Sequence, residues 1–349
     1  MSPKRKKGLW VVVLSAALVA TVGVSAATGP AYINPGEALA IILSHIPLMG
    51  RLVGDGPWHD AAAEIIVMEV RLPRIALGLL VGAALSAAGA CFQGLFRNPL
   101  ADPYIIGVSS GSALGAALGI LLTVASPGGS APSIPVFAFA GALITVMFVY
   151  ALATVDGKLP TDTFLLAGVV VGSFVWAAVS FLMVVAGEDL PKVVMWLMGS
   201  LSAKGWSHVL GTAPYVLAGI AVLSAMGRDF NLVAVGEEPA RYMGLDVERF
   251  KRIAIVFGSL ITAAAVASSG LIGFVGLIVP HVTRMLIGPD HRFLIPVSAV
   301  GGAIFLVAAD TLARTAMAPR EIPVGIITAI AGAPFFFYLL RKRKRSGVF

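Results

Sequence analysis

The stretch GRDFNLVAVGEEPARYMGLDVERFKR, residues 227–252, is the longest polar interruption between apolar runs in the second half of the chain. Its GEEPARYMG core predicts a short helix that begins at Gly236, because acids and a proline occupy the first turn, and Gly244 can adopt the left-handed conformation that ends a helix. Asp246 is then placed to cap a second helix. The pattern predicts two short helices with a glycine hinge. A docking knob for a partner and a plain folded loop are equally good interpretations of such a unit.

The composition of the chain indicates an integral membrane protein. Of 349 residues, 58% are hydrophobic and 12% are charged, about half the charge of a soluble chain. The apolar runs are long enough for helices and lack the alternation of a membrane barrel. The net charge of +7 does not indicate a nucleic-acid partner, since the basic residues gather in short loops and at both chain ends. Cys91 is the single cysteine, which excludes an internal disulfide and a thiolate metal cluster.

The apolar runs predict an all-α polytopic protein with about ten transmembrane helices. Basic residues at both chain ends place both termini in the cytoplasm, so the number of crossings must be even and the run 253–287 must cross twice. Its reach of about 52 Å falls short of the roughly 60 Å of two crossings. We therefore expect shortened helices with a reversal near Gly270, Gly273 and Gly276. The expected spans are residues 9–28, 71–96, 104–125, 135–155, 163–186, 208–226, 253–287 (twice), 293–312 and 322–340.

Residues 1–349 predict one transmembrane domain with two segments outside the membrane. Residues 30–70 are expected to form a periplasmic segment, with an amphipathic helix over 35–49 that lies along the membrane interface. Residues 227–252 are expected in the cytoplasm, and 18 of the 25 Lys and Arg residues fall on that side of the membrane. The first run ends in VSA, residues 24–26, which also fits a signal-peptidase site. We expect this helix to be retained.

Arginines are expected at the outer mouths of two spans, Arg71 and Arg74 in the motif RLPR and Arg314 near Arg320. One interpretation is snorkelling to lipid headgroups. The other is bidentate binding of carboxylates on an acidic external partner. Asp310 is the one acid near the middle of a span, and we expect it to pair with Arg314, four residues further on. A proton-coupled carrier usually needs a buried acid, so this sequence supports one poorly.

Small residues and prolines mark packing and turns inside the expected bundle. Glycines, serine and alanine recur every four residues in the second and third spans, which predicts close helix packing, with a sliding gate as the alternative. The sequence FRNPLADP, residues 96–103, contains two prolines that each favour an extended preceding residue. It predicts a rigid turn at the inner mouth of the second span, beside the 227–252 segment, and is a candidate inner gate.

Motifs for enzyme chemistry are missing from the sequence. It has no P-loop, so it does not bind ATP through a motif of its own, and no HExxH zinc motif. The five histidines are scattered, and a lone loop histidine is more often solvated than a ligand. The spans offer no serine–lysine or paired-aspartate site. We expect no enzyme, no metal site and no cofactor in this chain.

Several motifs together resemble the permease subunits of ABC importers for iron chelates, haem and cobalamin, the FecCD type. They are RLPR followed by a small-residue helix, GLFRNPLADPYIIGVSSGSALG, GEEPARYMGLDVERFKR, SGLIGFVGLIVPHVTRMLIGPDHRFLIP and REIPVGIITAIAGAPFFFYLLRK. They occur in the family's order over residues 71–341. The resemblance implies a single permease domain of about ten helices that forms a homodimer in the bacterial or archaeal cytoplasmic membrane. It also implies two ATPase subunits inside, which bind ATP and Mg, and a bilobed binding protein outside.

The resemblance also implies roles for individual residues. Docking of the binding protein would fall on Arg71, Arg74 and Arg314. The cytoplasmic gate would include Asn98 and Leu100, and a second gate element would lie near Thr161 and Asp162. The pathway would be lined by the fifth span around Gly168, Gly172 and Ser173. The coupling helix that seats in the ATPase would comprise Glu237, Glu238, Pro239, Ala240, Arg241, Tyr242, Met243 and Gly244.

The residues of this chain indicate its architecture more directly than they indicate its substrate. Residues 187–206 place Met195, Trp196 and Met198 near the expected pathway mouth. An adaptable apolar lining suits a large ligand, although core packing explains the same residues equally well. We expect a ferric siderophore or haem, with cobalamin as the alternative. A secondary carrier without an ATPase, and a membrane scaffold or intramembrane enzyme, are the competing classes.

Overall fold

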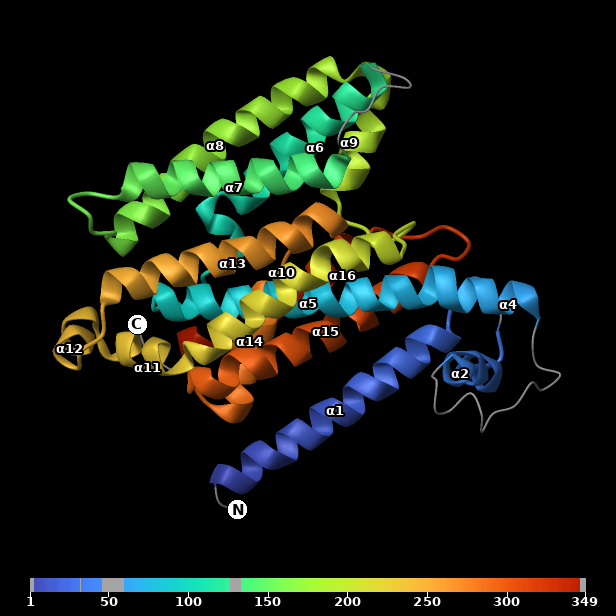
Figure 1. Cartoon of the computed structure of the whole chain (residues 1–349), viewed down its shortest axis with the longest axis horizontal. Coiled ribbons are helices and arrows are strands. Elements are labelled where there is room, and N and C mark those ends of the chain that lie inside the picture. The colour runs from blue at the N-terminus through green and yellow to red at the C-terminus, as the bar shows by residue number, and fades with distance from the viewer. Residues whose placement is uncertain (1–2, 32, 46–59, 126–132, 346–349) are drawn as a thin grey trace.

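The computed structural model describes residues 3–31, 33–45, 60–125 and 133–345, and helices dominate these ranges (Figure 1). The first half contains α1 (Pro3–Ala27), α2 (Pro35–Ser44), α4 (Ala61–Ile65), the π-helix η1 (Ile66–Arg71), α5 (Leu72–Leu95), the 3₁₀ helix η2 (Pro103–Ile106), α6 (Val108–Ala125) and α7 (Ile134–Ala153). The second half contains α8 (Thr161–Val185), the 3₁₀ helix η3 (Gly187–Asp189), α9 (Leu190–Leu197), α10 (Trp206–Ala225), α11 (Gly227–Val235), α12 (Glu237–Tyr242), α13 (Val247–Ser269), α14 (Val275–Ile287), α15 (His291–Thr315) and α16 (Val324–Arg345).

Each of the ten expected spans corresponds to a helix in the described ranges: α1, α5, α6, α7, α8, α10, α13, α14, α15 and α16. Six helical segments in these ranges are long and apolar enough to cross a membrane on their own, and the remaining apolar helices are shorter. The amphipathic helix expected over 35–49 is observed as α2, and residues 46–49 lie outside the described residues. The all-α polytopic fold is therefore confirmed.

The long helices run along one axis, which gives the bundle two ends (Figure 1). One end carries α11 and α12, together with both chain ends, and we call it the α12 end. The other carries α4 and the C-terminus of α1, and we call it the arginine end because Arg71, Arg74 and Arg314 lie there. Termini on the same side match the even number of crossings that the basic chain ends predict.

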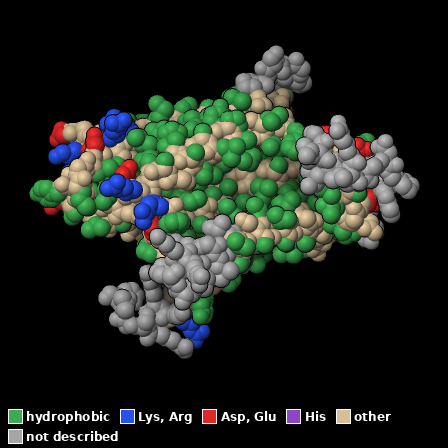
Figure 2. Space-filling view, turned by 60° about the horizontal axis from the view of Figure 1, so that its bottom comes forward, with side chains coloured by type: hydrophobic (Ala, Val, Ile, Leu, Met, Phe, Trp, Pro, Cys, Tyr) green, Lys and Arg blue, Asp and Glu red, His purple; other side chains and the backbone are tan. Residues whose placement is uncertain are grey.

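Apolar side chains cover the flanks between the two ends. Figure 2 shows a face that is hydrophobic or uncharged over its middle, with Lys and Arg gathered toward the α12 end and acidic side chains at both ends. Large apolar side chains on α7 and α8 are strongly exposed, among them Met147 at 70%, Phe174 at 76% and Val184 at 83%. Such continuous apolar exposure suits contact with lipid or with another membrane helix.

The run 253–287 reverses within the bundle, as the sequence predicts. α13 ends at Ser269, and Gly270 continues with a φ of 71°, a conformation that glycine adopts readily. α14 has 13 residues, and it is therefore only about 20 Å long. The Tyr104 hydroxyl donates to Ile272 O at 3.0 Å and accepts from Ile272 N at 3.2 Å. Tyr104 thereby satisfies backbone groups that the broken helix leaves without helical partners.

α5 forms the centre of the bundle and is buried along nearly its whole length. Its small residues allow neighbouring backbones to approach closely, the structural interpretation of the small-residue pattern. A Cβ on Gly82 would lie 2.2 Å from Gly302 O of α15, and one on Gly89 would lie 1.8 Å from Gly276 O of α14. Both contacts require glycine because the obstructing atoms belong to backbone and cannot move aside without separating the helices.

Gly89→Ala is expected to lower the free energy of unfolding by about 2 kcal/mol or more, since α14 must shift away from α5. Gly211→Ala on α10 is the matched control, because a Cβ there meets no atom within 4 Å. Denaturant unfolding of both variants in mixed micelles measures the difference. Equal stability of the two variants would contradict the close α5–α14 contact.

Candidate functional site: the arginine network, the α12 segment and the inner turns

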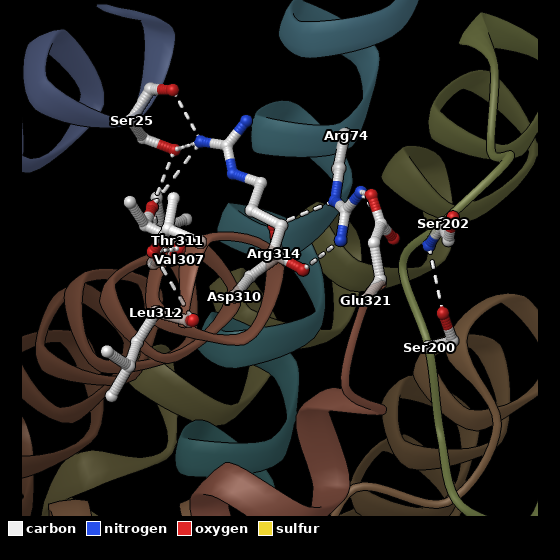
Figure 3. A network of polar contacts seen from close by, with 11 residues as sticks. Ser25, Arg74, Ser200, Ser202, Val307, Asp310, Thr311, Leu312, Arg314 and Glu321 are labelled. Carbon is white, nitrogen blue, oxygen red and sulfur yellow. Dashed lines mark hydrogen bonds and ion pairs between the residues drawn. The ribbon is translucent and has the colours of Figure 1, made fainter. Parts of the chain in front are cut away.

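Arg74 binds two carboxylates at the arginine end of α5 (Figure 3). Its Nε lies 2.8 Å from Asp310 Oδ2, and its Nη2 lies 2.9 Å from Asp310 Oδ1, a bidentate pair. Its Nη1 lies 2.8 Å and 3.0 Å from the two carboxylate oxygens of Glu321. The side chains of Arg74 and Asp310 are 9% and 3% exposed, whereas that of Glu321 is 30% exposed. The network therefore joins α5, α15 and the loop before α16, and Glu321 is its most accessible carboxylate.

Arg71 and Arg314 bind the C-terminal end of α1 instead. Arg71 Nη1 donates to Ala26 O at 2.6 Å, and its Nη2 donates to Ala31 O. Arg314 Nη2 donates to the carbonyl oxygen of Ser25 and, at 2.6 Å, to Ser25 Oγ. The last carbonyl groups of a helix lack helical partners and carry partial negative charge, so two guanidinium groups are well placed there. These contacts fasten α1 to η1, which continues directly into α5, and to α15.

The three arginines lie deeper than the sequence predicts for a surface that grips a partner. Arg71, Arg74 and Arg314 are 3%, 7% and 2% exposed, and their hydrogen bonds are made within the chain. The pairing expected between Asp310 and Arg314 is wrong, because Asp310 gives both carboxylate oxygens to Arg74, which lies one helix away. The role of the three arginines in docking stays a prediction.

Glu321 is the titratable member of this network that lies outside the spanning helices. Partial burial acts to raise its pKa, but its hydrogen bonds and charge attraction to Arg74 outweigh this and hold the pKa below the usual value for a glutamate. A lowered carboxylate pKa means that the contact stabilises the folded state at neutral pH. That contribution is lost as the pH falls through the folded-state pKa.

The α12 segment has the form that the GEEPARYMG motif predicts. Gly236 has a φ of 144° before α12, and Gly244 has a φ of 87° after it. Asp246 Oδ1 accepts from Arg249 N at 3.0 Å and caps α13. The sequence did not indicate α11, which extends the segment toward α15.

α12 presents an apolar tip within a charged surface. Tyr242 is 91% exposed and Met243 is 54% exposed. Glu237 and Arg241, by contrast, turn back onto α13, where Arg241 Nη2 lies 3.0 Å from Glu248 Oε1. Exposed aromatic and Met side chains are typical of the centre of a protein–protein contact. Tyr242 and the adjoining Met243 are thus the exposed apolar side chains of this segment, and the charges nearby hold α12 in place.

α11 is joined to the turn before α15. Asn231 Oδ1 accepts from the backbone N of His291 at 2.9 Å, and Asn231 Nδ2 lies 2.7 Å from Asp290 Oδ1. The hydrogen bonds from Arg292 are the main reason that the pKa of Asp290 lies below its usual value, since they outweigh its slight burial. The ring of Phe230 stacks on that of His291 with 5.5 Å between centroids. This joint fixes the α12 segment to the bundle.

The two expected gate segments lie side by side at the α12 end. Asn98 Oδ1 accepts from Leu100 N at 2.9 Å, which closes the rigid turn after α5, and Leu100 is 44% exposed. Thr161 and Asp162 begin α8. The rings of Phe96 and Phe164, which flank these two segments, lie 6.1 Å apart.

The expected pathway residues on α8 differ in their positions. Gly168 is buried, and a Cβ there would lie 2.4 Å from Ile105 O, so it serves close packing and does not line an open space. Gly172 is half-buried near Ser110. Ser173 lies on the exposed face of α8, and its hydroxyl donates to Val169 O at 2.9 Å. Of the three, Ser173 is the residue available to a pathway.

An open hollow away from these three residues of α8 lies between α9, the α13–α14 reversal and α16. It measures about 680 Å³, and its lining includes Met198, Gly273, Phe274, Ile326 and Ala333. Sequence reasoning placed Met198 near the pathway mouth and missed the wall formed by the reversal and α16. Phe274, a non-glycine residue with a φ of 69°, marks this wall, but such a conformation has no sequence signal.

The helical bundle of the described residues, with its apolar flanks, is that of a multi-pass membrane protein. The chain belongs to the FecCD transport family, whose model matches residues 17–342. It is 52% identical over 282 residues to the cobalamin import system permease protein BtuC of Halobacterium salinarum, which covers 81% of this chain and 75% of that protein. It is 40% identical over 316 residues to the hemin transport system permease protein HmuU of Yersinia pestis, which covers 88% and 91% of the two chains.

A solved structure shows the same fold. It is described as an inward-facing conformation of a metal-chelate type ABC transporter and superposes with a TM-score of 0.80 at 31% identity, over 96% of this chain and 99% of that one. The resemblance drawn from the motifs is confirmed. The protein is a permease of the ABC importers, a class that works with ATPase and substrate-binding partners.

Proposed function

We propose that two copies of this chain form the membrane channel of an importer for a large metal chelate, a ferric siderophore or haem. Two ATPase subunits would bind at the α12 end, and a substrate-binding protein would bind at the arginine end. The observation that carries the proposal is the α12 segment, a capped helix with an exposed apolar tip that is fixed to the bundle by polar contacts. ATP and Mg would belong to the partner ATPase, and we expect no cofactor, no enzymatic activity and no nucleic-acid partner for this chain.

The α12 end is proposed to face the cytoplasm of a bacterial or archaeal cell, with the protein in the cytoplasmic membrane. Both chain ends lie at this end of the bundle, and each is strongly basic in sequence (Figure 1). Basic segments stay on the cytoplasmic side during insertion. Residues 30–70 would then lie on the external side, with α2 close to the membrane interface.

Transport would proceed by alternating access. ATP binding would close the two ATPases and move the α12 segments, which biases the channel between inward-open and outward-open states. The turn with Asn98 and Leu100 and the start of α8 with Thr161 and Asp162 would form the cytoplasmic gate. The pathway would run along the dimer axis, past Ser173 of α8 and the hollow at Phe274 and α16. The permease needs no tight site of its own because the binding protein delivers the substrate.

Cobalamin is the second candidate substrate. The relative that is 52% identical to this chain is named for cobalamin import, whereas the one named for hemin is 40% identical. The test is uptake into liposomes that contain this chain, its ATPase and its binding protein, with haem, a ferric siderophore and cobalamin offered in turn. ATP-dependent accumulation of haem or the siderophore supports the proposal. Accumulation of cobalamin alone would show that the substrate is cobalamin and not haem or a siderophore. If none of the three accumulated, the proposed class of substrate, a large metal chelate, would be contradicted.

Because Arg71, Arg74 and Arg314 are buried, a binding protein can pair with them only where a neighbouring side chain gives way. Glu321 occupies one side of Arg74 and is partly exposed, so an acidic side chain of the binding protein could reach Arg74 by taking the place of Glu321. Glu321→Gln should then strengthen binding of the binding protein several-fold, because the competing charge is gone. Surface plasmon resonance on the reconstituted complex measures this affinity. Weaker binding in Glu321→Gln would contradict an exchange at Arg74.

A further inference from the structure

The turn between α7 and α8, residues 154–160, is short and tightly closed. Val155 and Lys158 exchange backbone hydrogen bonds of 3.0 Å and 2.9 Å. Asp156 and Gly157 both have positive φ angles. Leu159 then enters the core at 3% exposure, two residues before α8 begins at Thr161. Leu159 is thus held in the core directly before the N-cap of α8.

Side chains of α13 hold both backbone polar groups of Leu159. The Leu159 N–H donates to Glu248 Oε2 at 3.0 Å. Lys251 Nζ donates to Leu159 O at 3.0 Å. The residues lie about ninety positions apart in sequence, so neither contact belongs to local helix or turn geometry. Two specific side-chain contacts thus fix this peptide to α13.

The same two side chains are also bound to α12. Lys251 Nζ lies 2.8 Å from Glu237 Oε2, and Glu248 Oε1 lies 3.0 Å from Arg241 Nη2. We call the four side chains, Glu237, Arg241, Glu248 and Lys251, the Leu159 clasp. Through this clasp a peptide at the start of α8 and the helix α12 share partners. Among the residues that the structure describes, no further hydrogen bond or ion pair links α12 to the α7–α8 turn.

Burying the Lys251 ammonium group costs free energy that an apolar side chain at this position would not cost. The side chain of Lys251 is 4% exposed, and a buried ammonium group loses hydration that its partners must replace. It also lies near the N-terminal end of α13, where the helix dipole disfavours a cation. An apolar side chain of similar length would pack there without these costs. What Lys251 adds is a fixed position of α12 relative to Leu159, since its ammonium group binds both.

We propose that Glu248 and Lys251 are positioning residues that transmit movement of α12 to the α7–α8 turn, and through it to Thr161 and Asp162 at the start of α8. This inference rests on the proposed coupling role of α12. It adds that one defined set of side chains connects α12 to one of the two gate segments. The other gate turn, with Asn98 and Leu100, follows the end of α5, and among the described residues no hydrogen bond joins it to the clasp.

The experiment follows a reporter thiol at the gate in the complete complex. Asp162 is exposed, and Cys91 is fully buried, so Asp162→Cys places a reactive thiol where Cys91 contributes little background. The rate of maleimide labelling is compared without nucleotide and with trapped ATP, while ATP hydrolysis and uptake are measured on the same vesicles. With Lys251 in place, the two labelling rates should differ by about fivefold or more.

Lys251→Met should remove this difference in labelling and lower uptake about tenfold or more, while the complex still hydrolyses ATP. Lys251→Arg keeps a cation for Leu159 O and Glu237, and it should retain much of the nucleotide dependence. Arg252→Met is the matched control, since it removes a cation from the adjacent, exposed position. Where Lys251→Met does not fold, Glu248→Ala and Glu248→Gln replace it. The Gln variant keeps an acceptor for Leu159 N and should be closer to the native chain.

The proposal is overturned when Lys251→Met, or Glu248→Ala in its place, labels with the same nucleotide dependence as Arg252→Met. Failure of the proposed function has a different signature. In that case the Asp162→Cys chain without any further substitution shows no nucleotide-dependent labelling, or loss of the α12 tip leaves ATPase assembly unchanged. Uptake that falls together with ATP hydrolysis in Lys251→Met but not in Arg252→Met would assign Lys251 to ATPase binding, which also contradicts the clasp.

Discussion

Replacing Asp310 by alanine is expected to lower the free energy of unfolding by about 3 kcal/mol, because it leaves a buried guanidinium group without its bidentate partner. Asp310 is 3% exposed in its side chain, and both of its oxygens bind Arg74. The loss falls at the lower end of the range for such pairs since Glu321 remains bound to Nη1 of Arg74. Denaturant unfolding in mixed micelles gives the value directly.

Two further variants distinguish the contribution of the Arg74–Asp310 ion pair from that of the surrounding contacts. The double substitution Arg74→Met with Asp310→Leu removes both charges and should recover most of the stability, because no buried charge is left alone. Glu321→Ala should cost about 1 kcal/mol or less, since this carboxylate is partly hydrated. A double variant as unstable as Asp310→Ala alone would show that packing at these positions, and not the ion pair, is responsible.

Truncating Tyr242 and Met243 together to alanine is expected to weaken assembly with the ATPase by about a hundredfold or more, as for the central residues of an interface. The exposure of both side chains implies little effect on the fold of the permease itself. Co-purification of the ATPase and the midpoint of thermal unfolding of the permease are the two measurements. The first should fall sharply, and the second should stay within about 1 °C.

Arg241→Glu is the informative comparison for this prediction. Arg241 pairs with Glu248 at 3.0 Å and lies 3.8 Å from Glu237, so the change acts on the Leu159 clasp inside the chain. It should reduce uptake while the ATPase still assembles. Normal ATPase assembly in the Tyr242 and Met243 variant would contradict the assignment of α12 as the ATPase contact.

The spanning helices were predictable because long apolar runs in the sequence identify them. Every expected span has its helix, and the short reach of residues 253–287 foretold both the reversal after Ser269 and the brief α14. The caps at Gly236, Gly244 and Asp246 were also predictable, since each depends on local backbone requirements. Features that depend on near neighbours in sequence are thus recovered from the sequence.

The partners of the charged residues were not predictable in the same way. Asp310 has Arg314 four residues away, yet it binds Arg74, 236 positions away in sequence. The rule for residues four apart describes one helix surface, whereas a close helix neighbour offers a better bidentate geometry. The Leu159 clasp was missed for the same reason, because Glu248 and Lys251 contact Leu159 from about ninety positions away in sequence. Gly168 is a packing residue since its neighbour Ile105 lies on another segment.

The most direct test of the account measures substrate uptake and ATP hydrolysis together, in liposomes with the permease, its ATPase and its binding protein. The native chain should accumulate a metal chelate only when ATP is available on the side of the α12 end, and hydrolysis should rise when loaded binding protein is added. The Tyr242 and Met243 variant should lose both uptake and stimulated hydrolysis. Uptake that continues without ATP, or that survives loss of the α12 tip, would contradict a permease coupled to an ATPase through α12.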